Sequence, residues 1–491
     1  MLKEWILTTN ERLLLVNKYK LSFKTPAELL KYIEEQEVQF IDLNFTDIRG
    51  KWQHITQHSS HFTKSSIDEG IVFDGSSVAG WSELHKSDML LRPDIKHTTY
   101  DPFAAQKTIK LFCDIYEPES RLPYTRDPRA VALAAENYLK KSGIGDNVYF
   151  GAEVEFFIFD DVKINTQSHH MSYKLDSEEG EYNKGRDYPT GNLGHRPHAQ
   201  GGYMTEAPID SLSDIRAEML SVIESMGVEV EGHHHEIAPA QCELGIKFSS
   251  LLQSADNIQI YKHAVQNVAR SYGKSATFMP KPINDYRGSG MHLHQSIWKS
   301  GKPVFSGKSY ANLSETALYY IGGILKHARS LSAFTNPSTN SYKRLNPKYK
   351  APVLLAYSES NRSAACRVPF APSPKDRRIE IRFPDPLANP YLAFSAMLMA
   401  GIDGIENKIH PGEAIDKNLH DLPEEDISSA TQLCSSLECA LNALKDDHDY
   451  LLRGDVFTSD LIETFIDLKM QEIEHLNETT HPVEVDMYYS G

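Results

Sequence analysis

The stretch GAEVEFFIF, residues 151–159, decides the fold because its carboxylates alternate with apolar side chains. Successive side chains of a β-strand point to opposite faces, so Glu153 and Glu155 share one face and Val154 and Phe156 share the other. An amphipathic strand of this kind can simply turn its polar face to water. Paired carboxylates can instead line a cleft that binds cations.

Two further segments predict strands of the same kind, GMHLHQSIW at residues 290–298 and RRIEIRF at residues 377–383. In each segment, the alternate residues that share one face are polar or charged. They are His292, His294 and Ser296 in the first segment, and Arg378, Glu380 and Arg382 in the second. Each strand alone fits a water-facing surface. Taken together, the three favour a cleft for metal ions and phosphate, which need carboxylates, imidazoles and guanidinium groups side by side.

The segment EGHHHEIAPAQCELGIKF, residues 231–248, adds two more carboxylates. Glu236 and Glu243 are an odd number of residues apart, so one regular strand would place them on opposite faces. Pro239 interrupts the strand, and a bent hairpin would turn both carboxylates inward. The three consecutive histidines fit a polar turn or a zinc site, but zinc is disfavoured because carboxylates outnumber imidazoles and no cysteine pair accompanies them.

Five carboxylates and one histidine from these segments suit two hard divalent ions such as Mg²⁺ or Mn²⁺. Five arginines also fall in one later stretch: Arg344, Arg362, Arg367, Arg378 and Arg382. Guanidinium groups bind carboxylate and phosphate through two parallel hydrogen bonds, so this cluster indicates a doubly anionic substrate and phosphoryl chemistry. The alternative is ordinary surface salt bridging.

Composition limits the class of protein. The 491 residues carry 51 Lys and Arg against 67 Asp and Glu, a net charge of −16, which argues against a nucleic-acid partner. The apolar run Tyr391–Ile402 is shorter than the ~20 residues of a membrane-spanning helix, and the N-terminus does not resemble a secretion signal. We therefore expect a cytoplasmic protein that does not associate with a membrane. The five cysteines form no CxxC pair, and we interpret them as reduced thiols.

The order of predicted elements indicates an α+β protein with two domains. A helix over residues 26–36, with Thr25 as its N-cap, precedes strands at 38–45 and 107–114. Prolines at 117–129 predict a linker, and a helix at 130–142 follows. Later helices are predicted at 213–226, 254–272, 315–330 and 390–405. We expect an extension at 1–24, a first domain at 25–120 and a larger domain at 121–491.

Six ordered motifs resemble those of type I glutamine synthetases, ATP-dependent ligases that join ammonia to glutamate. They are FDGSS (73–77), EVEFF (153–157), HHHE (233–236), GSGMHLH (288–294), NRSAACR (361–367) and RRIEIRFPDP (377–386). The resemblance runs from about residue 25 to the C-terminus and is strongest for the adenylylated bacterial subtype. It implies an N-terminal β-grasp domain followed by a larger glutamine-synthetase-type catalytic α/β domain. It also implies a homo-dodecamer of two hexameric rings, with the C-terminal HPVEVDMYYSG as a strap between rings.

The resemblance also implies roles for individual residues. The metal ligands are Glu155, Glu236 and Glu243 at one ion and Glu153, His292 and Glu380 at the other. The substrate-binding set is Glu155, Gly288, His292, Arg344, Arg362 and Arg382, in which Arg344 and Arg382 hold the amino-acid carboxylate and Arg362 the transferred phosphate. The nucleotide set is Glu231, His294, Ser296, Arg367, Lys375 and Arg378. Asp74, from a neighbouring subunit, binds and deprotonates ammonium, and it joins Arg362 and Arg382 as a catalytic residue.

Four departures from the family pattern bear on the acceptor and on regulation. Lys350 replaces a glutamate of the flap that helps to form the ammonium site, and Arg287 replaces an asparagine of the substrate loop. The interval from HHHE to the following CE is one residue shorter than in the closest subtype. His420 stands where that subtype has the tyrosine that is adenylylated, so we expect no such control.

Three functions remain open on these residues. The first is glutamine formation from glutamate, ATP and ammonia through a γ-glutamyl phosphate. The second is a γ-glutamyl ligase that uses another amine or another acid, which the changes at Lys350 and Arg287 favour. The third is a non-catalytic ring subunit, which the intact metal and arginine positions disfavour.

Overall fold

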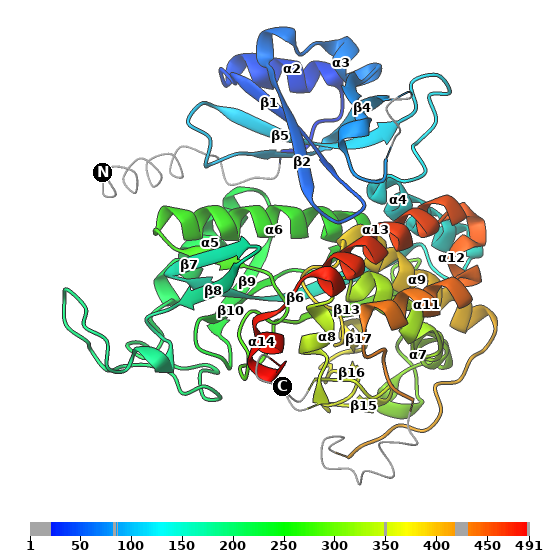
Figure 1. The fold of residues 1–491 in the computed structure, drawn as a ribbon. Coiled ribbons are helices and arrows are strands. Elements are labelled where there is room, and N and C mark those ends of the chain that lie inside the picture. The colour runs from blue at the N-terminus through cyan, green and yellow to red at the C-terminus, as the bar shows by residue number, and fades with distance from the viewer. Residues whose placement is uncertain (1–20, 82–84, 86, 348–350, 418–430, 489–491) are drawn as a thin grey trace.

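The computed structural model describes residues 21–81, 85, 87–347, 351–417 and 431–488 (Figure 1). A small N-terminal sheet lies above a larger body of sheet and helices, and the helices α4 (Pro128–Ser142) and α6 (Leu251–Ser271) lie between the two. The predicted α+β class, with a β-grasp domain before the catalytic domain, is confirmed.

The N-terminal sheet has the strand order β2-β1-β5-β4-β3, with β1 and β5 parallel and the other pairs antiparallel. The predicted first helix is present, since the Thr25 side chain accepts a hydrogen bond from the Glu28 amide and the helix buries Leu29 and Ile33. The elements are α2 (Pro26–Glu35), β1 (Phe40–Thr46), β2 (Trp52–His58), α3 (Lys64–Asp68), β3 (Ile71–Asp74), β4 (Asp88–Tyr100) and β5 (Thr108–Tyr116).

The large sheet follows the order β15-β16-β17-β13-β6-β10-β9, so the three predicted polar-faced strands are neighbours or near neighbours. The predicted strand over 377–383 is shorter, with regular pairing only over β17, and Arg378 and Arg382 flank it. The main strands are β6 (Asn147–Phe159), β9 (Val230–His235), β10 (Gln241–Ile246), β13 (Met291–Lys299), β15 (Tyr357–Glu359), β16 (Cys366–Val368) and β17 (Ile379–Ile381). Short strands β11 (Ser249–Ser250), β12 (Ser275–Thr277) and β14 (Lys302–Pro303) pair at its margins, and β7 (Asp161–Gln167) forms a separate hairpin with β8 (His170–Asp176).

Helices pack against this sheet around one central helix, α9 (Pro390–Glu406), whose residues 390–404 are all buried. Gly323 of α7 (Glu315–Thr335) and Gly404 of α9 let these two helices touch, because a Cβ on Gly323 would lie 2.1 Å from the Ala400 carbonyl oxygen. The predicted helix over 254–272 starts earlier, since Ser250 caps it through the Gln253 amide. The remaining helices are α5 (Ser213–Ser225), α8 (Ser341–Arg344), α11 (Leu437–Asp446), α12 (Asp449–Leu452), α13 (Ser459–Glu478) and α14 (Pro482–Tyr488).

No helix in the described ranges is both long enough and apolar enough to cross a membrane. The apolar stretch Tyr391–Ile402 lies instead inside α9, at the centre of the protein.

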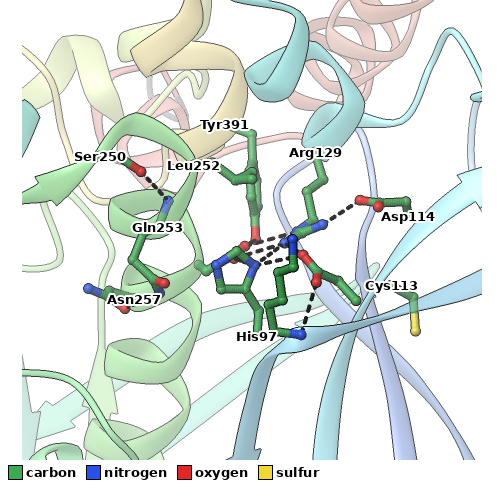
Figure 2. A network of polar contacts seen from close by, with 12 residues as sticks. His97, Cys113, Asp114, Arg129, Ser250, Leu252, Gln253, Asn257 and Tyr391 are labelled. Carbon is green, nitrogen blue, oxygen red and sulfur yellow. Dashed lines mark hydrogen bonds and ion pairs between the residues drawn. The ribbon is translucent and has the colours of Figure 1, made fainter. Parts of the chain in front are cut away.

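A buried ionic network joins the two domains (Figure 2). Arg129 of α4 binds the carboxylate of Asp256 on α6 through two hydrogen bonds of 3.2 Å, and it also contacts Asp114 of β5. The Tyr391 hydroxyl donates to the same Asp256 carboxylate at 2.7 Å. His97 of β4 lies 2.7 Å from an Arg129 nitrogen, so strands of the first domain and helices of the second share one cluster.

Candidate functional site

A cavity of about 440 Å³ lies over the polar face of the central strands. Both acidic residues and arginines line it. Among the predicted residues, its wall contains Glu153, Glu155, Glu236, Glu243, Gly288, His292, Arg344, Arg362, Arg367 and Arg382. Residues from four segments that are far apart in the sequence therefore meet at one site.

The strand register explains why the carboxylates converge. In the antiparallel pair β6–β13, Glu153 lies opposite His292, and in the pair β6–β10, Glu155 lies opposite Glu243. Residues directly opposite in an antiparallel ladder point to the same face. The predicted faces of these strands are therefore confirmed.

The predicted bent hairpin is also present between β9 and β10. Ala240 adopts a positive φ of 66° in the turn, and the Glu236 amide donates to the Gln241 carbonyl oxygen at 2.9 Å. Nε2 of His234 lies 3.0 Å from a Glu236 oxygen and 3.9 Å from a Glu243 oxygen. These three side chains form a group that could hold a metal ion, and His234 is a member that the sequence did not single out.

A second such group contains Glu153, His294 and Glu380, whose ligand atoms lie within 4.8 Å of one another. His292 is close as well, with Nδ1 3.2 Å from a Glu153 oxygen and 4.0 Å from a Glu380 oxygen. Both histidines of β13 thus face the acidic pair, although the family resemblance assigns His292 to the metal and His294 to the nucleotide.

The pKa values of the carboxylates show where positive charge is needed. Burial, followed by the neighbouring Glu236, raises the pKa of Glu155 to about 8. Burial, followed by Glu155, raises the pKa of Glu243 well above its ordinary value. Carboxylates that repel one another in this way would be stabilised as anions by a divalent cation. The residues therefore fit a metal site.

At the other group, protein cations already compensate the acids. Glu380 is fully buried, and burial would raise its pKa, but Arg382 and the two histidines outweigh burial and lower it. Burial is likewise outweighed at Glu153, where hydrogen bonds from His292 and His294 hold the pKa well below its usual range. This part of the site keeps its carboxylates ionised without a metal ion.

Gln241 is a positioning residue that the sequence did not reveal. Its side-chain amide donates to Glu155 at 3.1 Å and to the Gly288 carbonyl oxygen at 3.2 Å. The Gly290 amide also donates to Glu155, at 2.8 Å. A side chain at position 288 is excluded, since a Cβ there would lie 2.2 Å from the Pro280 carbonyl oxygen. A single buried glutamine beside Glu155 gives no periodic signal in the sequence.

The arginines of the cavity are held in different ways. Arg344 is buried and donates to the backbone carbonyl oxygens of Phe383 and Pro384 at 2.7 and 3.1 Å. Arg362 is exposed, and its guanidinium lies 5.6 Å from the ring centre of Tyr203, another lining residue that the sequence did not indicate. The hydrogen bond that the Arg362 guanidinium donates to the Tyr203 side chain raises the pKa of Arg362.

A third acidic group behind the hairpin is structural. His235 lies 2.9 Å from Glu179 through Nε2, and Glu179 also accepts from the Ala240 amide at 2.7 Å. Asp210, the remaining member, pairs with Arg216. All these charges are compensated by protein groups. Through its contacts with His235 and the Ala240 amide, Glu179 links the turn to the strand that precedes Glu236.

Several predicted residues do not line the cavity, among them the fully buried Glu380. Asp74 is exposed at the end of β3, where it accepts from the Ser76 amide at 2.9 Å. The nucleotide set other than Arg367 also lies outside the lining: Glu231, His294, Ser296, Lys375 and Arg378. Of these, Arg378 reaches the site indirectly, because its Nε donates to His294 at 3.2 Å.

The departures from the family pattern are only partly visible. Lys350 and His420 lie outside the described residues, whereas Ala351 and Pro352, which follow Lys350, line the cavity. Arg287 lines it too and donates to the Gln200 side chain at 3.3 Å. The change in the substrate loop therefore adds a cation to the cavity wall.

Comparisons with known proteins agree on one family. The models of the glutamine synthetase β-grasp domain and catalytic domain match residues 37–118 and 125–488. The chain is 57% identical to a glutamine synthetase of Azospirillum brasilense over 94% of its length and 99% of that protein. It is 53% identical to a 3-hydroxylaminophenol mutase of Cupriavidus pinatubonensis, over 94% and 99% of the two chains. The structure is similar to that of Plasmodium falciparum glutamine synthetase, with a TM-score of 0.88 and 28% identity over 96% and 100%.

Proposed function

Because this chain belongs to the glutamine synthetase family, we propose that it is a ligase that makes glutamine from glutamate, ammonia and ATP. The observation that supports this most strongly is the convergence of acidic strands and arginines on one cavity. Such a cavity can hold a phosphoryl group in transfer, together with the charged amino acid that receives it.

The metal sites of the proposed enzyme take Mg²⁺ or Mn²⁺, two or more per cavity. Glu155, Glu236 and Glu243 hold one ion, and Glu153, His292 and Glu380 hold the other. Oxygen-rich ligand sets of this kind suit hard divalent ions. A bound ion would neutralise charge on the transferred phosphoryl group.

The protein side chains supply the rest of the chemistry. Arg344 and Arg382 hold the carboxylate of glutamate, while Gly288 leaves room for its amino end. Arg362 meets the transferred phosphate. The γ-carboxylate attacks the terminal phosphorus of ATP and releases ADP, which gives an acyl phosphate; ammonia then attacks its carbonyl carbon, and phosphate leaves.

The ammonium ion must lose a proton before it attacks, so a carboxylate is needed at the attack position. We assign this role to Asp74 of a neighbouring subunit, because Asp74 is exposed and does not line the cavity of its own chain. A ring assembly, with twelve subunits as in the family, would bring it there. The exposed Val483, Val485 and Met487 of α14 support a role for this helix as a strap between rings.

Light scattering tests the assembly, with a large ring oligomer as the expected result. An active monomer would contradict the shared site.

We infer that the enzyme works in the cytoplasm, where glutamate and ATP are available.

The activity is tested by ATP turnover with Mg²⁺ or Mn²⁺, glutamate and a panel of ammonia and small amines, with phosphate and amide product measured separately. We expect equal amounts of phosphate and glutamine with ammonia. Glu380→Gln is the matched inactive control, since it retains the shape of the side chain and removes its charge. No phosphate release with any amine would identify a non-catalytic ring subunit instead.

One observation favours a second candidate, a γ-glutamyl ligase with another amine or acid as co-substrate. Arg287 adds positive charge to the cavity wall and so favours a more acidic substrate. In the same panel, amide formation with an acidic acceptor at higher kcat/KM than with ammonia would select this candidate. Arg287→Asn should then shift the preference back towards ammonia.

A further inference from the structure

Two thiols meet beside the first turn of α11. Cys434 precedes the helix, and Cys439 lies in its first turn, where its amide donates to the Ser436 side chain at 3.1 Å. The two thiols are close enough to interact electrostatically. Both are free cysteines, Cys434 buried and Cys439 partly exposed.

Arg329 of α7 contacts both sulfur atoms. Its Nη2 donates to Cys439 Sγ at 3.3 Å, and its carbonyl oxygen accepts from Cys434 Sγ at 3.9 Å. A guanidinium group and the N-terminal end of a helix both stabilise a thiolate. Cys439 is therefore the thiol that is equipped to attack, since it has both features and reaches solvent.

The remaining cysteines differ from Cys439. Cys113, Cys242 and Cys366 are buried, and burial raises the pKa of each thiol. Burial, followed by Cys439, also raises the pKa of Cys434 to about 12. Cys434 thus stays protonated until a partner next to it is activated.

The thiol pair is connected to the cavity through the backbone. The Leu433 amide donates to the Val353 carbonyl oxygen at 3.0 Å, and the Leu355 amide donates to the Thr431 carbonyl oxygen at 3.0 Å. Ala351 and Pro352, directly before Val353, line the cavity. The residue before Cys434 is therefore hydrogen bonded to the segment that forms part of the cavity wall.

We propose that Cys434 and Cys439 form a reversible disulfide under hydroperoxide and that this disulfide changes the cavity wall at residues 351–353. The Cys439 thiolate attacks one peroxide oxygen and becomes a sulfenic acid, while the other oxygen leaves as hydroxide and takes up a proton to form water. The Cys434 sulfur then displaces the hydroxyl group of the sulfenic acid, and its own proton leaves with that group as a second water. A dithiol reductant reverses the change by thiol–disulfide exchange.

Formation of the disulfide does not depend on the proposed function, whereas the predicted effect on turnover rests on that function. The full-length oligomer is treated with hydrogen peroxide, and free thiols are counted before and after. We expect the count per chain to fall from five to three. Peptide mapping should find residues 434 and 439 linked, and dithiothreitol should restore all five thiols. An unlinked sulfinic acid at Cys439, or a link to another cysteine, would overturn the proposal.

Coupling to the cavity is measured by turnover and by hydrogen exchange. Oxidation should change kcat/KM about fivefold or more, as for other coupled sites, and dithiothreitol should reverse this. Cys439→Ser, whose side chain is partly exposed, should keep the reduced activity and lose the response to peroxide. Amide exchange over residues 351–356 should change on oxidation even if no ligase activity is found. A linked protein with unchanged exchange and unchanged turnover would overturn the coupling.

Discussion

Arg367 donates from Nη1 to Oε2 of the fully buried Glu380, at 2.6 Å. Arg382 contacts the other oxygen of the same carboxylate. The group that contains Glu155 and Glu243 is different, because burial and neighbouring acids raise the pKa values of both carboxyl groups. Protein charge alone therefore balances Glu380, whereas Glu155 and Glu243 need a cation.

Replacing a proposed metal ligand should stop phosphoryl transfer. We expect Glu153→Ala and Glu380→Gln each to lower kcat by about 100-fold or more, since each variant would bind less tightly the divalent ion that stabilises the transferred phosphoryl group. ATP turnover measures the rate, and Mg²⁺ titration by calorimetry separates lost binding from slow chemistry. Full turnover in either variant would remove these residues from the metal site.

Metal-free protein should lose stability as the pH rises from about 5 to 8. Glu155 has a pKa of about 8 in the folded protein against an ordinary value of 4.5, so the folded state retains a proton that the unfolded state has released. This group alone lowers the free energy of unfolding by at most about 1.4 kcal/mol per pH unit.

Thermal melts in EDTA across this pH range check the slope. Excess Mg²⁺ should flatten it, because the ion stabilises the carboxylate anion. Glu155→Gln is the control and should show a smaller slope in EDTA. A melting temperature in EDTA that rises over the range would contradict the pKa shift.

Removing Arg129 should destabilise the whole chain. Arg129→Met leaves the buried Asp256 without its cation, and losing one partner of a buried ion pair costs about 3–5 kcal/mol. Urea unfolding measures the change. Lys247→Met removes the exposed pair with Glu229 and should cost less than about 1 kcal/mol. Equal effects of the two substitutions would show that the Arg129 network contributes no special stability.

Glutamine formation from ammonium should be poor and should improve in Lys350→Glu. If the flap closes as in the family, a lysine ~4 Å from ammonium repels it by roughly 1 kcal/mol in water and about 4 kcal/mol at an effective dielectric of 20. The larger value weakens binding by nearly a thousandfold.

We expect Lys350→Glu to lower the apparent KM for ammonium and to raise glutamine formation about tenfold or more at low ammonium. Steady-state kinetics with ammonium as the variable substrate gives the answer. Saturation of the unsubstituted protein at millimolar ammonium, unchanged by the substitution, would show that Lys350 does not face the ammonium site.

Local periodicity predicted most of the strands and their faces. The sequence correctly assigns Glu153 and Glu155 to one face of β6 and His292 to the polar face of β13, because side-chain alternation is a property of a single strand. The turn at Pro239 was predicted because proline disrupts strand pairing locally. Gln241 and Tyr203 were not predicted, since their importance depends on contacts with residues far away in the sequence.

The network around Arg129 was not predicted for the same reason. Because of this network, the linker near residue 120 does not mark a point at which the chain can be divided without loss. A polypeptide divided there would carry Asp94, His97 and Asp114 on one piece and Arg129 and Asp256 on the other. Each piece would expose charges that the intact chain satisfies internally. The linker therefore separates two folds that stabilise each other through this network, and truncation at this point would yield two destabilised fragments.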